Sequence, residues 1–186
     1  MHQFVICAGI DNNSRLPDRR QKRTDFMTKT LLVLLSAVLL TDLPPAMPSL
    51  PAAPSKYVTD YAGVLRPGTA DRLSSQLADF DHRTADELII VIYPNIPKGV
   101  SIGDYARQLY EAWKIGKRGT DTGALLLIAT QDHQGRIHAG RGLEAKLTEE
   151  TCRKIFTDRV APRLDSNDYD GACKAAANAL IEAASR

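Results

Sequence analysis

Two unbroken apolar runs constrain this chain more than any other feature of its sequence. Residues 88–93 read Leu-Ile-Ile-Val-Ile-Tyr, and residues 123–129 read Gly-Ala-Leu-Leu-Leu-Ile-Ala. Short continuous runs of this kind are typical of strands that are buried on both faces of a parallel sheet. The chain is therefore expected to form a sheet that helices cover on both sides.

The segment between the two runs predicts an amphipathic helix. Ser101 is a suitable N-cap, and Asp104 follows it three residues later, which approximates a capping box. An apolar stripe then recurs at helical spacing through Ile102, Ala106, Leu109 and Trp113. Strand, helix and strand together predict a βαβ unit with a right-handed crossover.

Further elements flank this unit on both sides. Residues 70–80 carry apolar side chains at helical spacing before the first run, and residues 136–139 predict a shorter, more polar, antiparallel strand. Helical patterns follow after Thr148, which is a suitable N-cap. We therefore predict an α/β fold, a three-layer α/β/α sandwich in which a small mixed sheet has helices on both faces.

The first part of the sequence is typical of an exported protein. Lys29 precedes the apolar run 31–40, which is too short to span a bilayer comfortably. Five prolines lie within residues 44–54 and predict an extended spacer. We interpret residues 1–55 as a signal peptide region and Pro-rich spacer, with an alternative start at Met27, and residues 56–186 as the domain. The expected location is the periplasm or another extracytoplasmic space, with a membrane tether if the leader is not cleaved.

The charge distribution argues against nucleic acid as a partner. The chain has 24 basic and 22 acidic residues, but the basic excess lies in the first thirty residues, and residues 56–186 contain 18 of each sign. A phosphate-backbone binder needs a basic surplus on the domain itself. The run Gly140–Ala145 matches G-x-G-x-x-A, yet only helical patterns follow it, so no nucleotide cofactor is expected.

Cysteine and histidine give weaker signals. Cys152 and Cys173 both lie in helical patterns near the C-terminus, and either a disulfide or two buried thiols is consistent with the sequence. His133 and His138 flank the turn before the third strand without a metal-ligand spacing. We interpret both histidines as exposed turn and strand residues.

Three carboxylates beside glycines are the candidates for chemistry. Asp60 lies just before the first helix, Asp121 lies just before the second apolar run, and Glu144 follows the pair Gly140 and Gly142. Carboxylates in such loops can hold a hard cation such as Ca²⁺ or Mg²⁺. They can equally cap the turns in which they lie. The two glycines allow a positive φ or a close backbone approach at a strand end.

Taken in order, several short motifs resemble a known family. They are Val58-x-Asp60-x-Ala62-Gly63-Val64-Leu65, Ile102-x-x-Tyr105-Ala106, Trp113-x-Ile115-Gly116, Asp121-x-Gly123 with the three leucines after Ala124, and Ile137-x-x-Gly140-x-Gly142-Leu143-Glu144. In order and spacing they resemble the TPM domain family, which includes bacterial YgcG-like proteins and thylakoid-lumen proteins. The resemblance covers essentially the whole region after the Pro-rich spacer.

The resemblance implies an α/β/α sandwich, an extracytoplasmic location and a phosphatase that binds a divalent cation in an acidic groove. Carried over by motif, Asp60 and Asp121 would be metal ligands of the groove with Glu144 as a third, and Asp121 would also be catalytic. The residues expected to shape the loops are Trp113, Gly116, Gly123, Gly140 and Gly142, and those expected to contact phosphate are Lys117, Arg118 and Arg141. In the loop after Gly116, where relatives carry an acidic cluster, this chain retains only Asp121.

Two functions are consistent with these features. The first is metal-dependent hydrolysis of phosphomonoesters, with Ca²⁺ or Mg²⁺ as the cofactor. The second is a non-catalytic cation-binding module that assists the assembly or quality control of envelope proteins, with envelope or membrane proteins as partners. The oligomeric state is left open.

Overall fold

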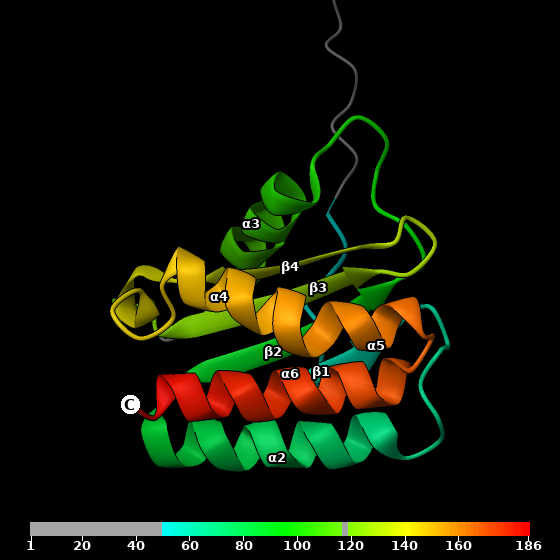
Figure 1. Ribbon diagram of the computed structural model, residues 1–186. Coiled ribbons are helices and arrows are strands. Elements are labelled where there is room, and N and C mark those ends of the chain that lie inside the picture. The colour runs from blue at the N-terminus through cyan, green and yellow to red at the C-terminus, as the bar shows by residue number, and fades with distance from the viewer. Residues whose placement is uncertain (1–49, 117–118) are drawn as a thin grey trace, which may run out of the picture. The chain divides into compact units, whose positions relative to one another are not determined.

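A four-stranded mixed sheet forms the centre of the fold (Figure 1). This computed structural model describes residues 50–116 and 119–186, so the predictions about the signal region, Met27, Lys117 and Arg118 lie outside the described residues. Strands β1, β2 and β3 run parallel and β4 runs antiparallel to β3. In sheet order they are β1 (Val58–Asp60), β2 (Glu87–Tyr93), β3 (Gly123–Ala129) and β4 (Gln134–Ala139). Strand β1 was not predicted from the sequence, because three residues are too few to show an alternating pattern.

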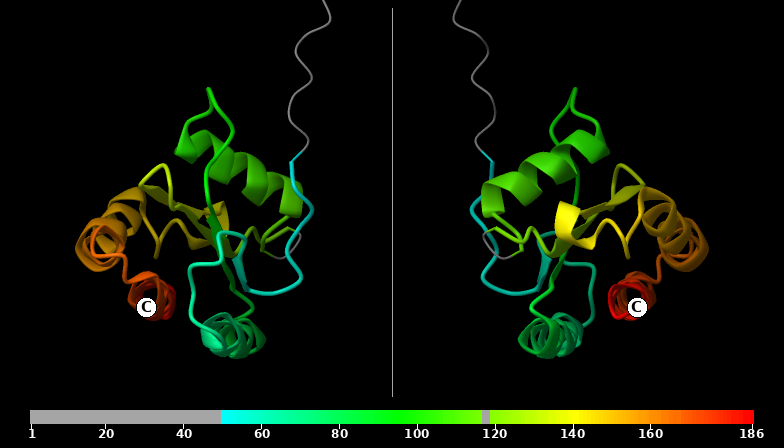
Figure 2. Two further views of the ribbon diagram at one scale, coloured as in Figure 1. Left: turned by 90° about the vertical axis from the view of Figure 1, so that its right-hand side faces the viewer. Right: turned by 90° about the vertical axis from the view of Figure 1, so that its left-hand side faces the viewer.

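Helices cover both faces of this sheet, which confirms the three-layer sandwich (Figures 1 and 2). Helix α3 (Ile102–Trp113) packs on one face with its own group of buried side chains. A larger helical layer packs on the opposite face. It consists of α2 (Thr69–Thr84), α4 (Glu149–Ile155), the π-helical turn η2 (Phe156–Val160), α5 (Ala161–Asp165) and α6 (Tyr169–Ala184).

The two apolar runs of the sequence are β2 and β3, and alternate residues supply the two cores. In β2, Ile90 and Ile92 contact the layer of α2 and α6, whereas Ile89 and Val91 contact the layer of α3. In β3 every residue is buried. Burial on both faces explains why neither run alternates with polar residues.

The two crossovers that join the parallel strands have opposite hands. The chain steps from β1 to β2 and from β2 to β3 in the same direction across the sheet. The connecting helices α2 and α3 nevertheless pack on opposite faces. One of the two connections therefore departs from the right-handed crossover expected for a βαβ unit.

Helix starts follow the predicted caps. The Ser101 hydroxyl accepts a hydrogen bond from the Asp104 amide (3.1 Å), and the Thr148 hydroxyl accepts one from the Thr151 amide (3.1 Å). No helix within residues 50–116 and 119–186 combines the length and the hydropathy that a membrane span requires.

Of the two alternatives for the cysteines, the structure contains the free thiols. Cys152 and Cys173 are both buried in the core beneath the larger helical layer. Burial raises the pKa of Cys152 to about 11 and that of Cys173 to about 12. Both thiols therefore stay protonated near neutral pH and act as core side chains.

Candidate functional site

An open groove of ≈ 960 Å³ lies where the loop before β3 meets the turn after β4. Because β3 and β4 are antiparallel, the start of one strand adjoins the end of the other. The Gly140 amide accordingly donates to the Gly123 carbonyl oxygen (2.8 Å). The second half of α3 forms the remaining wall through Arg107, Tyr110 and Glu111.

Asp121 is the structural centre of this groove. Its Oδ1 atom accepts a hydrogen bond from the Tyr110 hydroxyl (2.7 Å), and its Oδ2 atom accepts one from the Arg141 amide (3.0 Å). Its carbonyl oxygen accepts a third bond, from the Gly142 amide (3.1 Å). The residue has a left-handed backbone with φ of 51°. Aspartate is among the few side chains that tolerate this conformation, so Asp121 fixes both its own loop and the turn after β4.

Gly140 and Gly142 permit this close meeting of two loops. A Cβ atom on Gly140 would overlap the Tyr110 hydroxyl and the Asp121 carbonyl oxygen, and one on Gly142 would overlap the Thr120 carbonyl oxygen. Gly140 has an ordinary φ of −74°. Close approach, not a positive φ, is therefore the reason for glycine at this position.

A second glycine pair supports the loop from behind. A Cβ atom on Gly123 would lie 2.8 Å from the Gly116 nitrogen, and Gly116 itself has a left-handed φ of 89°. The Gly116 amide donates to the Glu87 carboxylate at the start of β2 (2.6 Å). Glu87 could not be identified from the sequence, because nothing there distinguishes its carboxylate from a solvent-exposed one.

Tyr110 and His138 are functional candidates that the sequence analysis did not identify. Their rings make an edge-to-face contact at 4.9 Å inside the groove. His138 is half-buried, so its interpretation as an exposed strand residue is wrong. Neighbouring strand residues point to opposite faces, so the side chain of His138 lies toward α3 while that of the buried Ile137 lies on the other face. This period-two pattern is the sequence signal that could have identified His138.

Burial sets the protonation of both rings. It lowers the pKa of His138 below its usual range, and the neighbouring Arg136 contributes in the same direction. It also raises the pKa of Tyr110, together with the hydrogen bond to Asp121. At neutral pH the groove therefore holds an uncharged imidazole and a protonated phenol.

The groove also contains side chains of both charges. Arg107 pairs with Glu111 (3.3 Å) on the surface of α3. Lys114, Arg141 and Glu144 line the groove but form no ion pair within the described part of the chain. Two cations are thus available to a ligand beside Asp121.

Comparison with known proteins identifies the family to which this chain belongs. The family model described as TPM domain matches residues 58–183. The chain belongs to the TPM domain family. Among curated relatives, two Mycobacterium tuberculosis proteins named UPF0603 protein Rv2345 and UPF0603 protein MT2410 are each 31% identical to this chain over 152 residues, which is 81% of the chain. The aligned part makes up only 22% of each relative's own length.

Solved structures share the fold of this TPM domain. The N-terminal domain of a P. gingivalis protein superimposes with a TM-score of 0.64 at 25% identity, covering 69% of this chain and 81% of its own. The N-terminal domain of cg2496 from Corynebacterium glutamicum gives 0.55 at 17% identity and covers 73% of this chain and 84% of its own. The BA42 protein of Bizionia argentinensis gives 0.54 at 12% identity, covering 65% and 81% respectively. The last two similarities show the fold alone.

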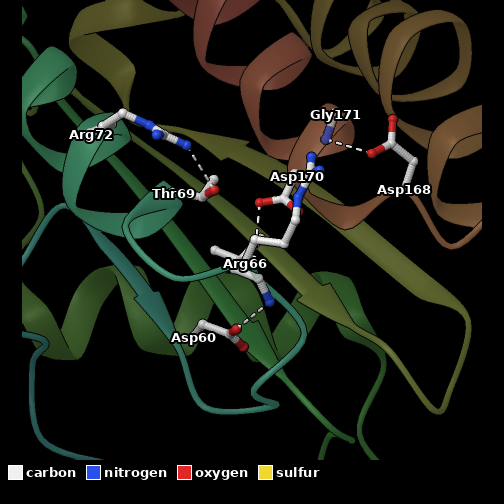
Figure 3. Close-up of polar contacts among 8 residues, drawn as sticks. Asp60, Arg66, Thr69, Arg72, Asp168, Asp170 and Gly171 are labelled. Atoms are coloured by element: carbon white, nitrogen blue, oxygen red, sulfur yellow. Dashed lines mark hydrogen bonds and ion pairs between the residues drawn. The ribbon is translucent and has the colours of Figure 1, made fainter.

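Asp60 lies close to Arg66, in the loop that leads to Thr69 at the start of α2 (Figure 3). The strand register places it at the opposite end of the sheet from the groove. It ends β1 and stands level with Ile128 in β3, whereas Asp121 precedes the first residue of β3, Gly123. Ile128 lies five residue steps along β3 from Gly123, which is about 16 Å at 3.3 Å per residue. The structure therefore does not bring Asp60 and Asp121 together.

The Asp60 carboxylate instead caps the loop between β1 and α2. Its Oδ1 atom accepts hydrogen bonds from the amides of Ala62 (3.0 Å) and Gly63 (2.8 Å), and its Oδ2 atom accepts one from the Leu65 amide (2.8 Å). The turn-capping alternative thus describes Asp60. Because of their separation, Asp60 and the groove acids cannot share a single cation. Within residues 50–116 and 119–186, no group of three or more His, Cys, Asp or Glu side chains is placed to hold a metal ion.

Trp113 has a different position from the one expected of a loop-shaping residue. Its indole Nε1 donates a hydrogen bond to the Pro51 carbonyl oxygen (2.8 Å), and Leu50 packs into the same apolar cluster on the α3 face. Trp113 therefore holds the end of the Pro-rich segment against the TPM domain. Gly116, Gly123, Gly140 and Gly142 are the residues that shape the loops of the groove.

Proposed function

We propose that this TPM domain binds the phosphoryl group of a phosphomonoester in the groove beside Asp121 and hydrolyses the ester outside the cytoplasm. The observation that carries the proposal is that Lys114 and Arg141 line the groove without an ion-pair partner in the described part of the chain. Lysine and arginine are suited to phosphate oxygens, and such charge-assisted hydrogen bonds are strong.

Asp121 has a positioning role in this proposal. It binds the Arg141 amide and thereby fixes the turn from which the Arg141 side chain projects. The family resemblance made Asp121 the catalytic residue, but both of its carboxylate oxygens already accept hydrogen bonds from the protein. Phosphate contacts by Lys117 and Arg118, which lie outside the described residues, stay a prediction.

His138 is the proposed proton carrier. Its pKa is lowered by burial, so it is neutral at pH 7 and can accept a proton from a water molecule. The water oxygen would form the new bond to phosphorus as the bond from phosphorus to the ester oxygen breaks. The proton held by His138 would then pass to the departing alkoxide, which leaves as an alcohol.

The proposed hydrolysis requires no metal ion. The expected ligand set of Asp60, Asp121 and Glu144 does not converge, and Asp60 is occupied by three backbone amides. The Ca²⁺ or Mg²⁺ prediction can be tested separately by thermal unfolding with millimolar cation, since a ligand of the native state raises stability by mass action. If the cation raises the unfolding temperature of the unmodified protein but not that of Asp121→Asn, the groove binds a metal ion.

The experiment pairs binding with turnover. Titration calorimetry with O-phosphoserine and phosphate release from p-nitrophenyl phosphate are measured on the whole protein and on Lys114→Ala, with Lys98→Ala as the matched control, because Lys98 is exposed and does not line the groove. We expect loss of affinity only in Lys114→Ala, and loss of turnover in His138→Gln. Equal affinities in the two lysine variants would refute the proposed site.

A second candidate function is a non-catalytic module that assists envelope proteins. It is supported by the side chains that line the groove, which include neither serine nor cysteine within the described residues. Phosphoserine binding without phosphate release would favour this function over hydrolysis. Export, common to both candidates, is tested by cell fractionation and by N-terminal sequencing of the mature protein.

A further inference from the structure

The groove at Asp121 is lined by side chains of both charges in equal number. The described charged residues of its lining are the cations Arg107, Lys114 and Arg141 and the anions Glu111, Asp121 and Glu144. Arg107 and Glu111 pair with each other on α3 (3.3 Å). The remaining lining is therefore balanced, and a ligand that carries only negative charge would meet carboxylates as well as cations.

Two of these opposite charges, on Arg141 and Glu144, project from the same side of one short turn. Arg141 begins the 3-10 turn η1 (Arg141–Leu143), and Glu144 caps its end with an amide that donates to the Arg141 carbonyl oxygen (3.3 Å). A 3-10 helix has three residues per turn, so side chains three positions apart eclipse one another. At a rise of about 2.0 Å per residue, the two positions lie about 6 Å apart along the axis.

The core holds this turn in place. Leu143, which lies between the two charged residues, is buried, and so is Leu147, whose amide donates to the Leu143 carbonyl oxygen (2.7 Å). Lys146 is the next cation along the chain, and its Nζ atom donates to the Ala184 carbonyl oxygen (2.6 Å). Lys146 therefore does not neutralise the Glu144 carboxylate.

Arg141 and Glu144 are both available to a ligand. Within the described residues neither forms an ion pair, with the other or with any third residue. Both side chains are exposed and both line the groove. A cation and an anion that are held side by side and left unpaired match a ligand that itself carries both signs of charge.

We propose that the groove selects phosphomonoesters that also carry a primary ammonium group, held by the Glu144 carboxylate while Lys114 and Arg141 hold the phosphoryl group. The inference rests on the proposed function, which supplies the phosphoryl site. The ligand class is a phosphorylated amino alcohol, in which a chain of two carbons keeps the two charged groups near each other. Neighbouring side chains of a single turn can then contact both groups.

Other phosphomonoesters lack part of this complementarity. A second anionic group on the ligand would face the carboxylates of Asp121 and Glu144. An uncharged tail would leave the Glu144 carboxylate without a partner in the occupied groove. A phosphoserine inside a polypeptide has no ammonium group, because its nitrogen belongs to a peptide bond. The charges of the groove therefore favour a free phosphorylated amine over a phosphorylated protein.

The test measures a ratio of two affinities on the whole protein. Titration calorimetry at low ionic strength, where screening is weakest, compares phosphoethanolamine with ethyl phosphate, which lacks only the ammonium group. We expect phosphoethanolamine to bind about fivefold more tightly, the upper range for an exposed ion pair. A ratio below about twofold would overturn the inference and leave the proposed phosphoryl site standing. If neither compound binds, the proposed function and this inference both fail.

Variants of Glu144 test the assignment of the ammonium site. Glu144→Gln should bring the ratio close to one, whereas Glu150→Gln should keep it, because Glu150 is exposed and does not line the groove. Glu144→Lys should instead prefer 2-phosphoglycolate, which carries a carboxylate where phosphoethanolamine carries its aminomethyl group. A ratio that survives Glu144→Gln would overturn the assignment.

A final comparison separates the two sources of a phosphomonoester. A peptide with one internal phosphoserine should bind more weakly than phosphoethanolamine, because it lacks the ammonium group. If the peptide binds as tightly or more tightly, the groove recognises phosphorylated protein segments, and the inference is overturned.

Discussion

The hydrogen bond between Tyr110 and Asp121 allows the sharpest quantitative test of the groove. Tyr110→Phe removes a hydroxyl that lies 2.7 Å from the Asp121 carboxylate and leaves the buried ring in place. A hydrogen bond to a charged group contributes about 1.5–3 kcal/mol to the free energy of unfolding. We expect Tyr110→Phe to lower that free energy by about 2 kcal/mol.

The Asp121 variants separate the hydrogen bonds from the backbone strain. Asp121→Ala loses the bonds to Tyr110 and Arg141 and must hold alanine at a φ of 51°, which adds about 1–2 kcal/mol to the loss. Asp121→Asn tolerates this φ and keeps both contacts, because its amide can accept from the Arg141 N–H and donate to the Tyr110 oxygen. We expect Asp121→Ala to be clearly less stable than Asp121→Asn.

The assay is urea unfolding of the two single variants and of the double variant. In the Asp121→Ala background, Tyr110→Phe should have almost no effect, because its partner is already absent. The double-mutant cycle should therefore return a coupling energy of about 2 kcal/mol between the two residues. A coupling below about 0.5 kcal/mol would refute the view that this bond organises the groove.

Three further predictions concern other parts of the TPM domain. Because burial lowers the pKa of His138 in the folded state, the unfolded chain takes up the proton first as the pH falls, so the free energy of unfolding should decrease below about pH 6.5. Urea midpoints measured against pH should fall less steeply in His138→Gln. An unchanged slope in that variant would contradict the burial argument. Trp113→Phe keeps an aromatic ring but loses the bond to Pro51, so limited proteolysis should cut residues 50–56 faster, and equal rates would show that the bond does not anchor the segment. Asp60→Ala removes the acceptor of three backbone amides and should lower the free energy of urea unfolding by about 2–4 kcal/mol. The affinity for O-phosphoserine should not change. A loss of that affinity would show that Asp60 contributes to the groove.

The fold could be predicted from the sequence because its strongest signals are local. The runs that became β2 and β3 are apolar throughout, since both of their faces are buried, and Ser101 and Thr148 cap the helices that they precede. The strand β1 escaped notice because its three residues contribute one fully buried side chain, Val58. Local sequence patterns therefore identify only those elements that are long enough to contain several repeats of the pattern.

The candidate site was harder to predict, because it depends on which ends of the strands meet. Asp60 is the last residue of its strand and Asp121 precedes the first residue of another, and in a parallel sheet these positions lie at opposite ends of the strands. Once β1 is known to be a parallel strand, the topology of the sheet excludes a cation site shared by Asp60 and Asp121. The partners of Asp121 come from α3 and from the turn after β4, and no sequence spacing connects them.

The groove separates residues that build it from residues that can serve a ligand. Asp121, Gly140 and Gly142 hold two loops in contact, so changing any of them alters the fold locally whatever the ligand is. Lys114 and Arg141 project from that framework without an ion pair in the described part of the chain, and their side chains should be replaceable with a change in stability of about 0.5 kcal/mol or less. The framework of this groove can therefore stay unchanged while its cations are replaced. The ligand of the groove must accordingly be argued from Lys114 and Arg141 and not from Asp121, Gly140 and Gly142.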